Sequence, residues 1–334
     1  MSEARPGAAK PSRLAPVGAK PSTLAIVAAF AAVYVLWGST YLGIRFSMET
    51  LPPYFTQGMR FFLAGVLLYA WARWRGEKAP TRREWGGATI TGALLFVCGS
   101  GGLVWAEHFI PSGVAALVVA TEPMSFVLLE AMRRRRRPHG VVLAGLALGT
   151  AGLLVLVGPG TFFGGERFHL GACLVLVAGS FAWAWGSLFS RGSRLPSSPL
   201  MATAATLLTG GGLLALVGVI AGELGRFDPS AVSAKSIVAT IYLFIFGSIV
   251  GFSAYLWLLR NATASRVSTY AYVNPIVAVF LGWALAGEPV SPRVLVAAVI
   301  IIGAVALIIR HGGEEENATA EDFGCAKAPE TLHA

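Results

Sequence analysis

Long apolar stretches alternate with short polar segments along most of the chain. Ten of these stretches reach the length of about 20 mostly apolar residues that a helix needs to cross a bilayer. The predicted spans are residues 23–46, 54–74, 86–107, 111–132, 140–158, 169–190, 200–221, 237–259, 267–286 and 292–309. The pattern therefore predicts an all-α integral membrane protein with ten transmembrane helices.

The two ends of the chain differ from these spans. Residues 1–22 are rich in Pro, Ala, Lys and Arg, and residues 311–334 are rich in Glu and Ala, so we expect disordered tails. The first apolar stretch is too long for the core of a signal peptide, and no clear cleavage site follows it. We therefore interpret it as a retained helix.

The basic residues are distributed unevenly between the two sides of this topology. With both tails inside, 20 of the 26 Lys and Arg residues lie on the cytoplasmic side, among them the five arginines 133–137. Cytoplasmic loops of membrane proteins carry an excess of Lys and Arg. This bias predicts that both termini are cytoplasmic.

Short sequence matches relate the two halves of the chain. In order, the matching pairs are Trp37-Gly38-Ser39 with Trp185-Gly186-Ser187, Gly99-Ser100 with Gly247-Ser248, and Glu122-Pro123 with Asn274-Pro275. They predict two repeats of five helices, residues 23–158 and 168–310. Because five is odd, the second repeat enters the membrane inverted, which is a common architecture of secondary transporters.

Three segments carry a resemblance to a known family. They are YVLWGSTYLGIRFSMETLPPYFTQGMRFFLAGVLLYAWARWRG, AEHFIPSGVAALVVATEPM and STYAYVNPIVAVFLGWALAGEPV. In these segments the chain resembles the drug/metabolite transporter superfamily, EamA type, although the Arg run 133–137 replaces the helix-end Gly-Glu in the first repeat. The resemblance implies two inverted repeats, a central cavity and export of small metabolites or drugs. We expect a bacterial inner-membrane location.

Composition narrows the function classes. Hydrophobic residues make up 55% of the chain and charged residues 13%, about half the charged share of soluble domains. The net charge of +9 comes from basic residues between apolar runs, and no nucleic-acid-binding motif is present. The chain has no Cys/His spacing for a metal and no phosphate-binding GxxxxGK[ST] loop. We therefore expect that the protein has no cofactor and is not an enzyme. Its expected partners are a small-molecule substrate and the lipid bilayer, with a proton as the candidate coupling ion and no nucleic acid.

Glu122 is the acidic residue that this topology places deepest. It lies eleven residues past Pro111 in the span 111–132, about 16 Å from its start at a rise of 1.5 Å per residue. A charged side chain there costs about 2.5–3.5 kcal/mol, and desolvation favours the neutral form of a carboxyl. Glu122, with Arg60, is our candidate for proton coupling. The alternative is a structural carboxyl, either protonated or paired with Arg60.

Other polar and aromatic residues fall near the same depth. The predicted substrate cavity consists of Trp37, Ser39, Tyr41, Glu122, Trp185, Tyr270 and Asn274. An aromatic wall with a few hydrogen-bonding groups is typical of small-molecule pockets. Pro123 and Pro275 lack an N–H and so predict paired helix kinks, although ordinary helix packing also explains each of these residues taken singly.

Two further function classes stay open. A channel or facilitator would use the same cavity without coupling to an ion. Ser100 in the segment CGSGG suggests an intramembrane hydrolase, but the sequence places no His or Lys at membrane depth to activate it. The sequence leaves the oligomeric state undetermined.

Overall fold

The computed structural model describes residues 22–106, 109, 118–119, 122–135, 140–157, 170–192, 195–286 and 292–312. These residues form helices and turns, and no strand occurs among them. The first half contains α1 (Thr23–Ala32), η1 (Val33–Trp37), α2 (Gly38–Ser47), α3 (Pro53–Trp74), α4 (Arg82–Gly92), η2 (Ala93–Ser100), α5 (Gly101–Ala106), α7 (Glu122–Arg134) and α8 (Gly140–Val157). The second half contains α10 (Leu170–Gly192), α11 (Pro199–Ile220), α12 (Glu223–Arg226), η3 (Pro229–Ala231), α13 (Ala234–Tyr242), η4 (Leu243–Gly251), α14 (Phe252–Asn261), α15 (Ala264–Val267), α16 (Tyr270–Ala286) and α17 (Pro292–Gly312).

Several of these helices have the length and composition of membrane spans. Within the described residues, five helical stretches are long and apolar enough to cross a bilayer: Thr23–Ile44, Arg82–Ala106, Gly171–Gly192, Pro199–Ile220 and Ala234–Asn261. Shorter apolar helices cover Gly140–Gly152 and Leu295–Ile308. The all-helical class predicted from the sequence is confirmed for the described residues, whereas the count of ten spans stays a prediction.

Helix starts depend on polar caps that lie outside the apolar runs. The span predicted to begin at residue 86 begins at Arg82, because Thr81 and Glu84 form a capping box in which Thr81 N donates to Glu84 Oε2 at 2.7 Å. The start of α3 is capped from the other half of the chain. There Glu223 of α12 accepts from the backbone N–H groups of Tyr54 (3.0 Å) and Phe55 (2.8 Å), which a helix N-terminus otherwise leaves without partners.

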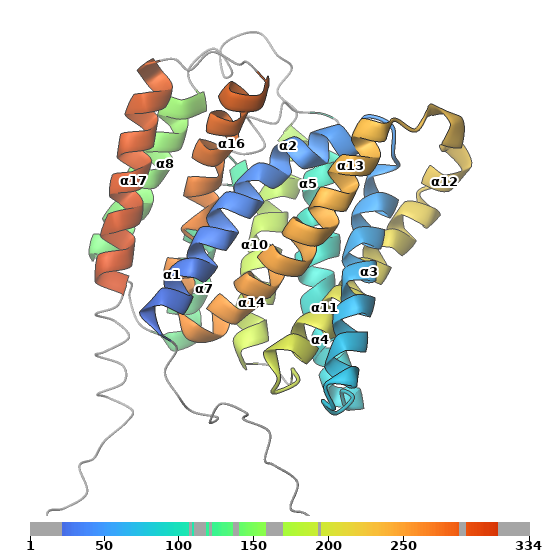
Figure 1. Cartoon of the computed structure of the whole chain (residues 1–334). Helices are drawn as coiled ribbons and strands as arrows, with labels where there is room; N and C mark the ends of the chain where they lie inside the picture. Colours follow the sequence, from blue (N-terminus) through green and yellow to red (C-terminus); the bar gives the residue numbers. More distant parts are fainter. Residues whose placement is uncertain are drawn as a thin grey trace, which may run out of the picture.

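Helices of the first half pack against helices of the second. At one edge of the molecule α8 lies beside α17, and towards the opposite edge α3 packs against α11 (Figure 1). Between these edges α2 contacts α13 and η2 contacts α10. The four pairs are antiparallel, because the residue numbers of contacting positions increase along one helix and decrease along the other. In α8 and α17, for example, Gly145 meets Ile308 and Gly152 meets Ile301.

Glycine allows the closest of these approaches, between α3 and α11. A Cβ added at Gly211 would lie 2.8 Å from the carbonyl oxygen of Gly58 and 2.8 Å from Phe61 Cβ, and one added at Gly58 would lie 2.6 Å from Ala215 Cα. Gly58 and Gly211 hold matching positions in the two halves, as do Phe62 and Ala215, because the same number of residues separates each pair. Gly58 contacts Ala215 and Gly211 contacts Phe62, so each half makes the same contact with the other. Small residues that bring backbones together are typical of helix pairs in membranes.

In the part of the chain that the structure describes, three segments widen from α-helix to π-helix. The segments η2 and η4 hold matching positions in the two halves, because the repeated pairs Gly99-Ser100 and Gly247-Ser248 fall within them or at their ends. The third, η1, ends at Trp37. Within the described residues, α10 is regular α-helix at the positions that match η1. π-Helical turns occur often at functional sites, and all three of these segments contribute residues to the cavity described below.

The glycine contact makes a prediction about stability. Gly211→Ala should destabilise the protein by about 1–3 kcal/mol, since the new methyl group overpacks the α3–α11 contact. Gly212→Ala is the matched control, because a Cβ at that position would meet Phe62 at an ordinary 3.4 Å. Thermal unfolding followed by circular dichroism in detergent measures both variants. An equal effect of the two substitutions would contradict the proposed packing.

Candidate functional site

A cavity of about 130 Å³ lies between the two halves of the chain. Most of its wall is aromatic or aliphatic, with a few polar groups, which is the usual character of a small-molecule pocket. Its lining residues are Trp37, Thr40, Ile44, Arg60, Phe61, Phe96, Gly99, Ser100, Leu103, Val119, Glu122, Leu176, Gly179, Ser180, Trp183, Gly247, Phe252, Tyr270 and Asn274.

Four residues of the predicted cavity meet here. Tyr270 at the start of α16 donates from its hydroxyl to Glu122 Oε1, and its ring lies edge-on to Trp37 with centroids 5.1 Å apart. Asn274 lies one helical turn further along α16; with its side-chain amide oriented so that the nitrogen faces these acceptors, it donates to the carbonyl of Tyr270 at 3.1 Å and to that of Tyr34 at 3.2 Å. The carboxyl, phenol, indole and amide groups therefore form one connected cluster from both halves.

Glu122 is 4% exposed. Its Oε1 atom accepts the Tyr270 hydroxyl, while no hydrogen bond from a described residue reaches Oε2. Arg60 also lines the cavity, but among the described residues no ion pair joins it to Glu122. The alternative in which Arg60 neutralises Glu122 is thus not the arrangement found.

Arg60 is held by neutral groups instead. It donates through Nε to Gln57 Oε1 on its own helix, and through Nη1 to Ser248 Oγ at 2.8 Å and to the carbonyl of Leu243 at 3.3 Å. Both partners from the second half belong to η4, and the Leu243 carbonyl also accepts from Ser248 at 3.2 Å. The π-helical segment therefore positions a guanidinium on the cavity wall.

Aromatic side chains pack around Trp37, which lines the cavity. Tyr255 lies 4.8 Å from Trp37 between ring centroids, and Trp183 lies 5.9 Å from it. Trp183 donates to the Tyr255 hydroxyl at 2.9 Å, and the same hydroxyl hydrogen bonds to Ser187 at 2.6 Å. Trp37 itself donates to the carbonyl of Gly247 at 3.3 Å. These bonds fix the indoles in place.

Two predicted residues lie elsewhere. Trp185 is 51% exposed and does not line the cavity, while Trp183 does. The prediction for Trp185 rested on its sequence match with Trp37, and Trp183, two residues earlier, points to nearly the opposite face of α10. Ser39 is also absent from the lining, and its hydroxyl bonds Tyr242 and donates to the Leu36 carbonyl at 2.7 Å.

Three further predictions concern residues that the structure describes in part. The side chain of Tyr41 lies outside the described residues. Pro275 lies inside α16, in the interior where it removes a helical hydrogen bond. Pro123 is the second residue of α7, and residues 120–121 before it lie outside the described residues, so a kink there stays a prediction.

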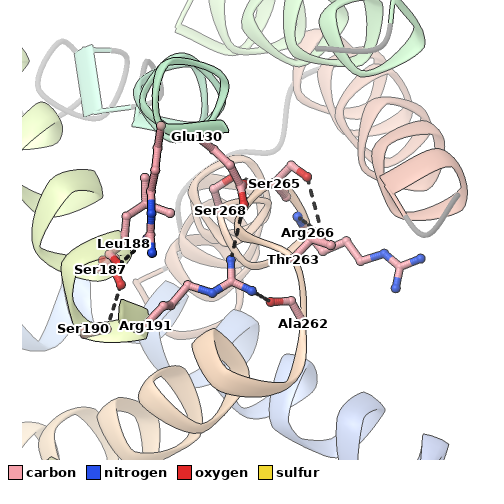
Figure 2. A network of polar contacts seen from close by, with 11 residues as sticks. Glu130, Ser187, Leu188, Ser190, Arg191, Ala262, Thr263, Ser265, Arg266 and Ser268 are labelled. Atoms are coloured by element: carbon pink, nitrogen blue, oxygen red, sulfur yellow. Dashed lines mark hydrogen bonds and ion pairs between the residues drawn. The ribbon is translucent and has the colours of Figure 1, made fainter. Parts of the chain in front are cut away.

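Beyond Tyr270 and Tyr255, a polar network joins three helical segments (Figure 2). Arg191 of α10 lies 3.8 Å from Glu130 of α7 and donates to the carbonyl of Ala262, which follows α14, at 2.6 Å. Arg133 of α7 donates to the carbonyl of Leu188 at 3.2 Å. The network ties the ends of these segments together on the side of the cavity where the arginine run 133–137 begins.

Sequence reasoning missed several members of the site. Phe96 and Phe252, whose ring centroids are 4.9 Å apart, gave no polar signal that would separate them from ordinary core residues. Ser180 and Thr40 could not be singled out either, because isolated hydroxyls are common in apolar helices. For Trp183 a signal was present in the sequence. Trp183 and Trp185 are two residues apart, so their indoles point to nearly opposite faces of an α-helix, and Trp183 was the alternative to Trp185 for the cavity side.

Relatives of this chain are named as membrane transporters. The uncharacterized inner membrane transporter YedA of Escherichia coli K12 is 39% identical over 284 residues, which are 85% of this chain and 90% of YedA. A probable amino-acid metabolite efflux pump of Escherichia coli K12 is 26% identical over 281 residues, 81% of this chain and 90% of that protein.

A solved crystal structure supports the fold. It covers 88% of this chain and 100% of its own chain with a TM-score of 0.72 at 22% sequence identity. The EamA-like transporter family matches residues 23–158 and 169–310, the two halves that both contribute residues to the cavity wall. By this match and by its similarity to YedA, the chain belongs to the EamA-like transporter family and is a membrane transporter.

Proposed function

We propose that the protein is a secondary active transporter that exports small metabolites or amphipathic drugs by alternating access around the central cavity. The observation that carries this proposal is a largely apolar cavity, built from both halves, that contains the buried carboxyl of Glu122. The Escherichia coli relative named as a probable amino-acid metabolite efflux pump is consistent with export.

The proposed topology is ten transmembrane helices in two inverted repeats of five, with both termini cytoplasmic. The distribution of 20 of 26 basic residues to one side supports the orientation. The antiparallel pairing of α3 with α11 and of α8 with α17 is the geometry expected when matching helices of inverted repeats pack together.

In this topology the cavity opens outward. Its lining extends to Ile44 near the end of α2, to Leu103 in α5 and to Leu176 near the start of α10, which the orientation places towards the extracytoplasmic side. Towards the cytoplasm, the aromatic cluster around Trp37 and the Glu130–Arg191 network hold the two halves together. Export would require the reverse state, in which these contacts separate and the opposite end closes.

Glu122 is the proposed coupling residue. A carboxyl with one oxygen bound by Tyr270 and the other free of described donors can take up or release a proton without breaking the surrounding packing. Its burial disfavours the charged form, so each opening of the cavity changes how readily the group holds a proton. Inward proton flow through this cycle would drive substrate outward.

Replacement of Glu122 tests the coupling. In inside-out vesicles with an acidified interior, a panel of amino acids, nucleobases and amphipathic drugs first identifies a transported compound. Glu122→Gln keeps the shape and removes titration, so accumulation should fall to about the equilibrium ratio while downhill exchange continues. Glu49→Gln, which changes an exposed carboxylate paired with Lys235, is the control and should accumulate normally.

Two outcomes would count against this proposal. If Glu122→Gln still concentrates the compound against its gradient, Glu122 is a structural residue and another ion drives transport. If the wild-type protein equilibrates the compound but never concentrates it under a pH gradient, the protein is an uncoupled facilitator.

A further inference from the structure

Arg60 carries a positive charge that no described acidic residue neutralises. It is 7% exposed, and the ion pairs formed by the described residues are Arg191 with Glu130 and Lys235 with Glu49. Its three partners, Gln57, Ser248 and the carbonyl of Leu243, are neutral. An uncompensated buried charge is costly, so buried charges are normally paired or functional.

The guanidinium also keeps one nitrogen free of described partners. Nε and Nη1 make the three hydrogen bonds above, and none from a described residue involves Nη2. Among the described residues, the fully buried side-chain atoms that lack a hydrogen-bond partner are Glu77 Oε2 and Thr91 Oγ1. Arg60 Nη2 also lacks a partner but is not one of these atoms, so it is not sealed inside packed protein. Because Arg60 is otherwise buried and lines the cavity, Nη2 is available to a ligand there.

The surroundings of Arg60 define what such a ligand needs. Phe61 lies beside the guanidinium, with Arg60 Cζ 4.0 Å from the ring centroid, and Phe61 and Phe96 are 4.2 Å apart between centroids. Gly247 leaves room near the charge, because a Cβ there would come within 3.3 Å of Arg60 Nη1. An anionic group next to an apolar, flat body would satisfy both the charge and the aromatic wall.

We infer that Arg60 is the anchor for an anionic group of the transported molecule, and that the substrates include small carboxylates with an apolar or aromatic body. Arginine binds carboxylates through strong charge-assisted hydrogen bonds. The cavity of about 130 Å³ is close in size to a protein cavity of roughly 150 Å³ that binds benzene, so we expect the apolar body to be no larger than a single ring. This inference rests on the proposed function, because it assigns a substrate class to the same cavity.

Benzoate and benzamide test the inference, because they share a shape and differ in charge at neutral pH. Binding to the full-length protein in detergent is followed by tryptophan fluorescence, to which Trp37 and Trp183 in the cavity contribute. The wild-type protein should bind benzoate at least tenfold more tightly than benzamide. Arg60→Gln should remove this preference while benzamide binding stays within about twofold, and Arg60→Lys should restore part of the preference.

Arg75→Gln is the matched control. Arg75 caps the end of the same helix, is exposed and lies 5.7 Å from the ring of Trp71, so its loss should leave the benzoate preference unchanged. Equal binding of benzoate and benzamide by the wild-type protein would overturn the inference, as would a preference that survives in Arg60→Gln. The comparison within the wild-type protein decides the question even if Arg60→Gln does not fold.

Failure of this inference differs from failure of the proposed transport. If Arg60 does not select carboxylates, a neutral compound from the transport panel can still accumulate under a pH gradient. If transport itself is absent, no compound accumulates, whatever the binding preference. The absence of binding by any of several aromatic and aliphatic monocarboxylates at millimolar concentration would also overturn the inference.

Discussion

The close approach of α3 and α11 is the constraint on which the rest of the structure depends. The two helices come from different halves and meet through glycines, with the start of α3 capped by Glu223 from beyond α11. Because α3 carries Arg60 and Phe61, this contact fixes one wall of the cavity relative to the second half. The neighbouring Gly210 leaves space for the ring of Phe96, another part of that wall. A larger residue at these glycines would therefore move the cavity as well as the helices.

The cost of polar groups inside a membrane explains how the remaining parts are arranged. In the apolar interior each hydroxyl, indole N–H and carbonyl needs a partner, and most of the aromatic cluster meets this need, as in the bonds from Trp183 to Tyr255 and from Trp37 to Gly247. The π-helical segment η4 contributes the carbonyls of Leu243 and Gly247 to side chains of other helices. Glu122 Oε2 and Arg60 Nη2 are different, since neither has a partner among the described residues. Both line the cavity, where a proton and a substrate can supply what is missing.

The sequence was sufficient for the helical class, and four of the residues it selected, Trp37, Glu122, Tyr270 and Asn274, lie on one cavity. Glu122, Tyr270 and Asn274 could be predicted because polar groups at mid-span depth are costly and so have a reason to be there. The start of α4 was misjudged, since apolar runs do not reveal a capping box such as that of Thr81 and Glu84. The choice of Trp185 over Trp183 failed for a geometric reason, because a short sequence match does not reveal which face of α10 points to the cavity. Two of the three partners of Arg60, Ser248 and the carbonyl of Leu243, were equally hidden, since they come from the other half of the chain.

The central claim is that this cavity opens to the extracytoplasmic side and is closed towards the cytoplasm. Cysteine accessibility tests it directly, with Leu103→Cys in a background in which Cys98, Cys173 and Cys325 are replaced by Ser. A membrane-impermeant thiol reagent should label this cysteine when added from the extracytoplasmic side and leave it unlabelled when added to inside-out vesicles. Lys78→Cys, in the exposed loop between α3 and α4, should show the opposite pattern. Labelling of Leu103→Cys from the cytoplasmic side alone would contradict the orientation of the cavity and the account built on it.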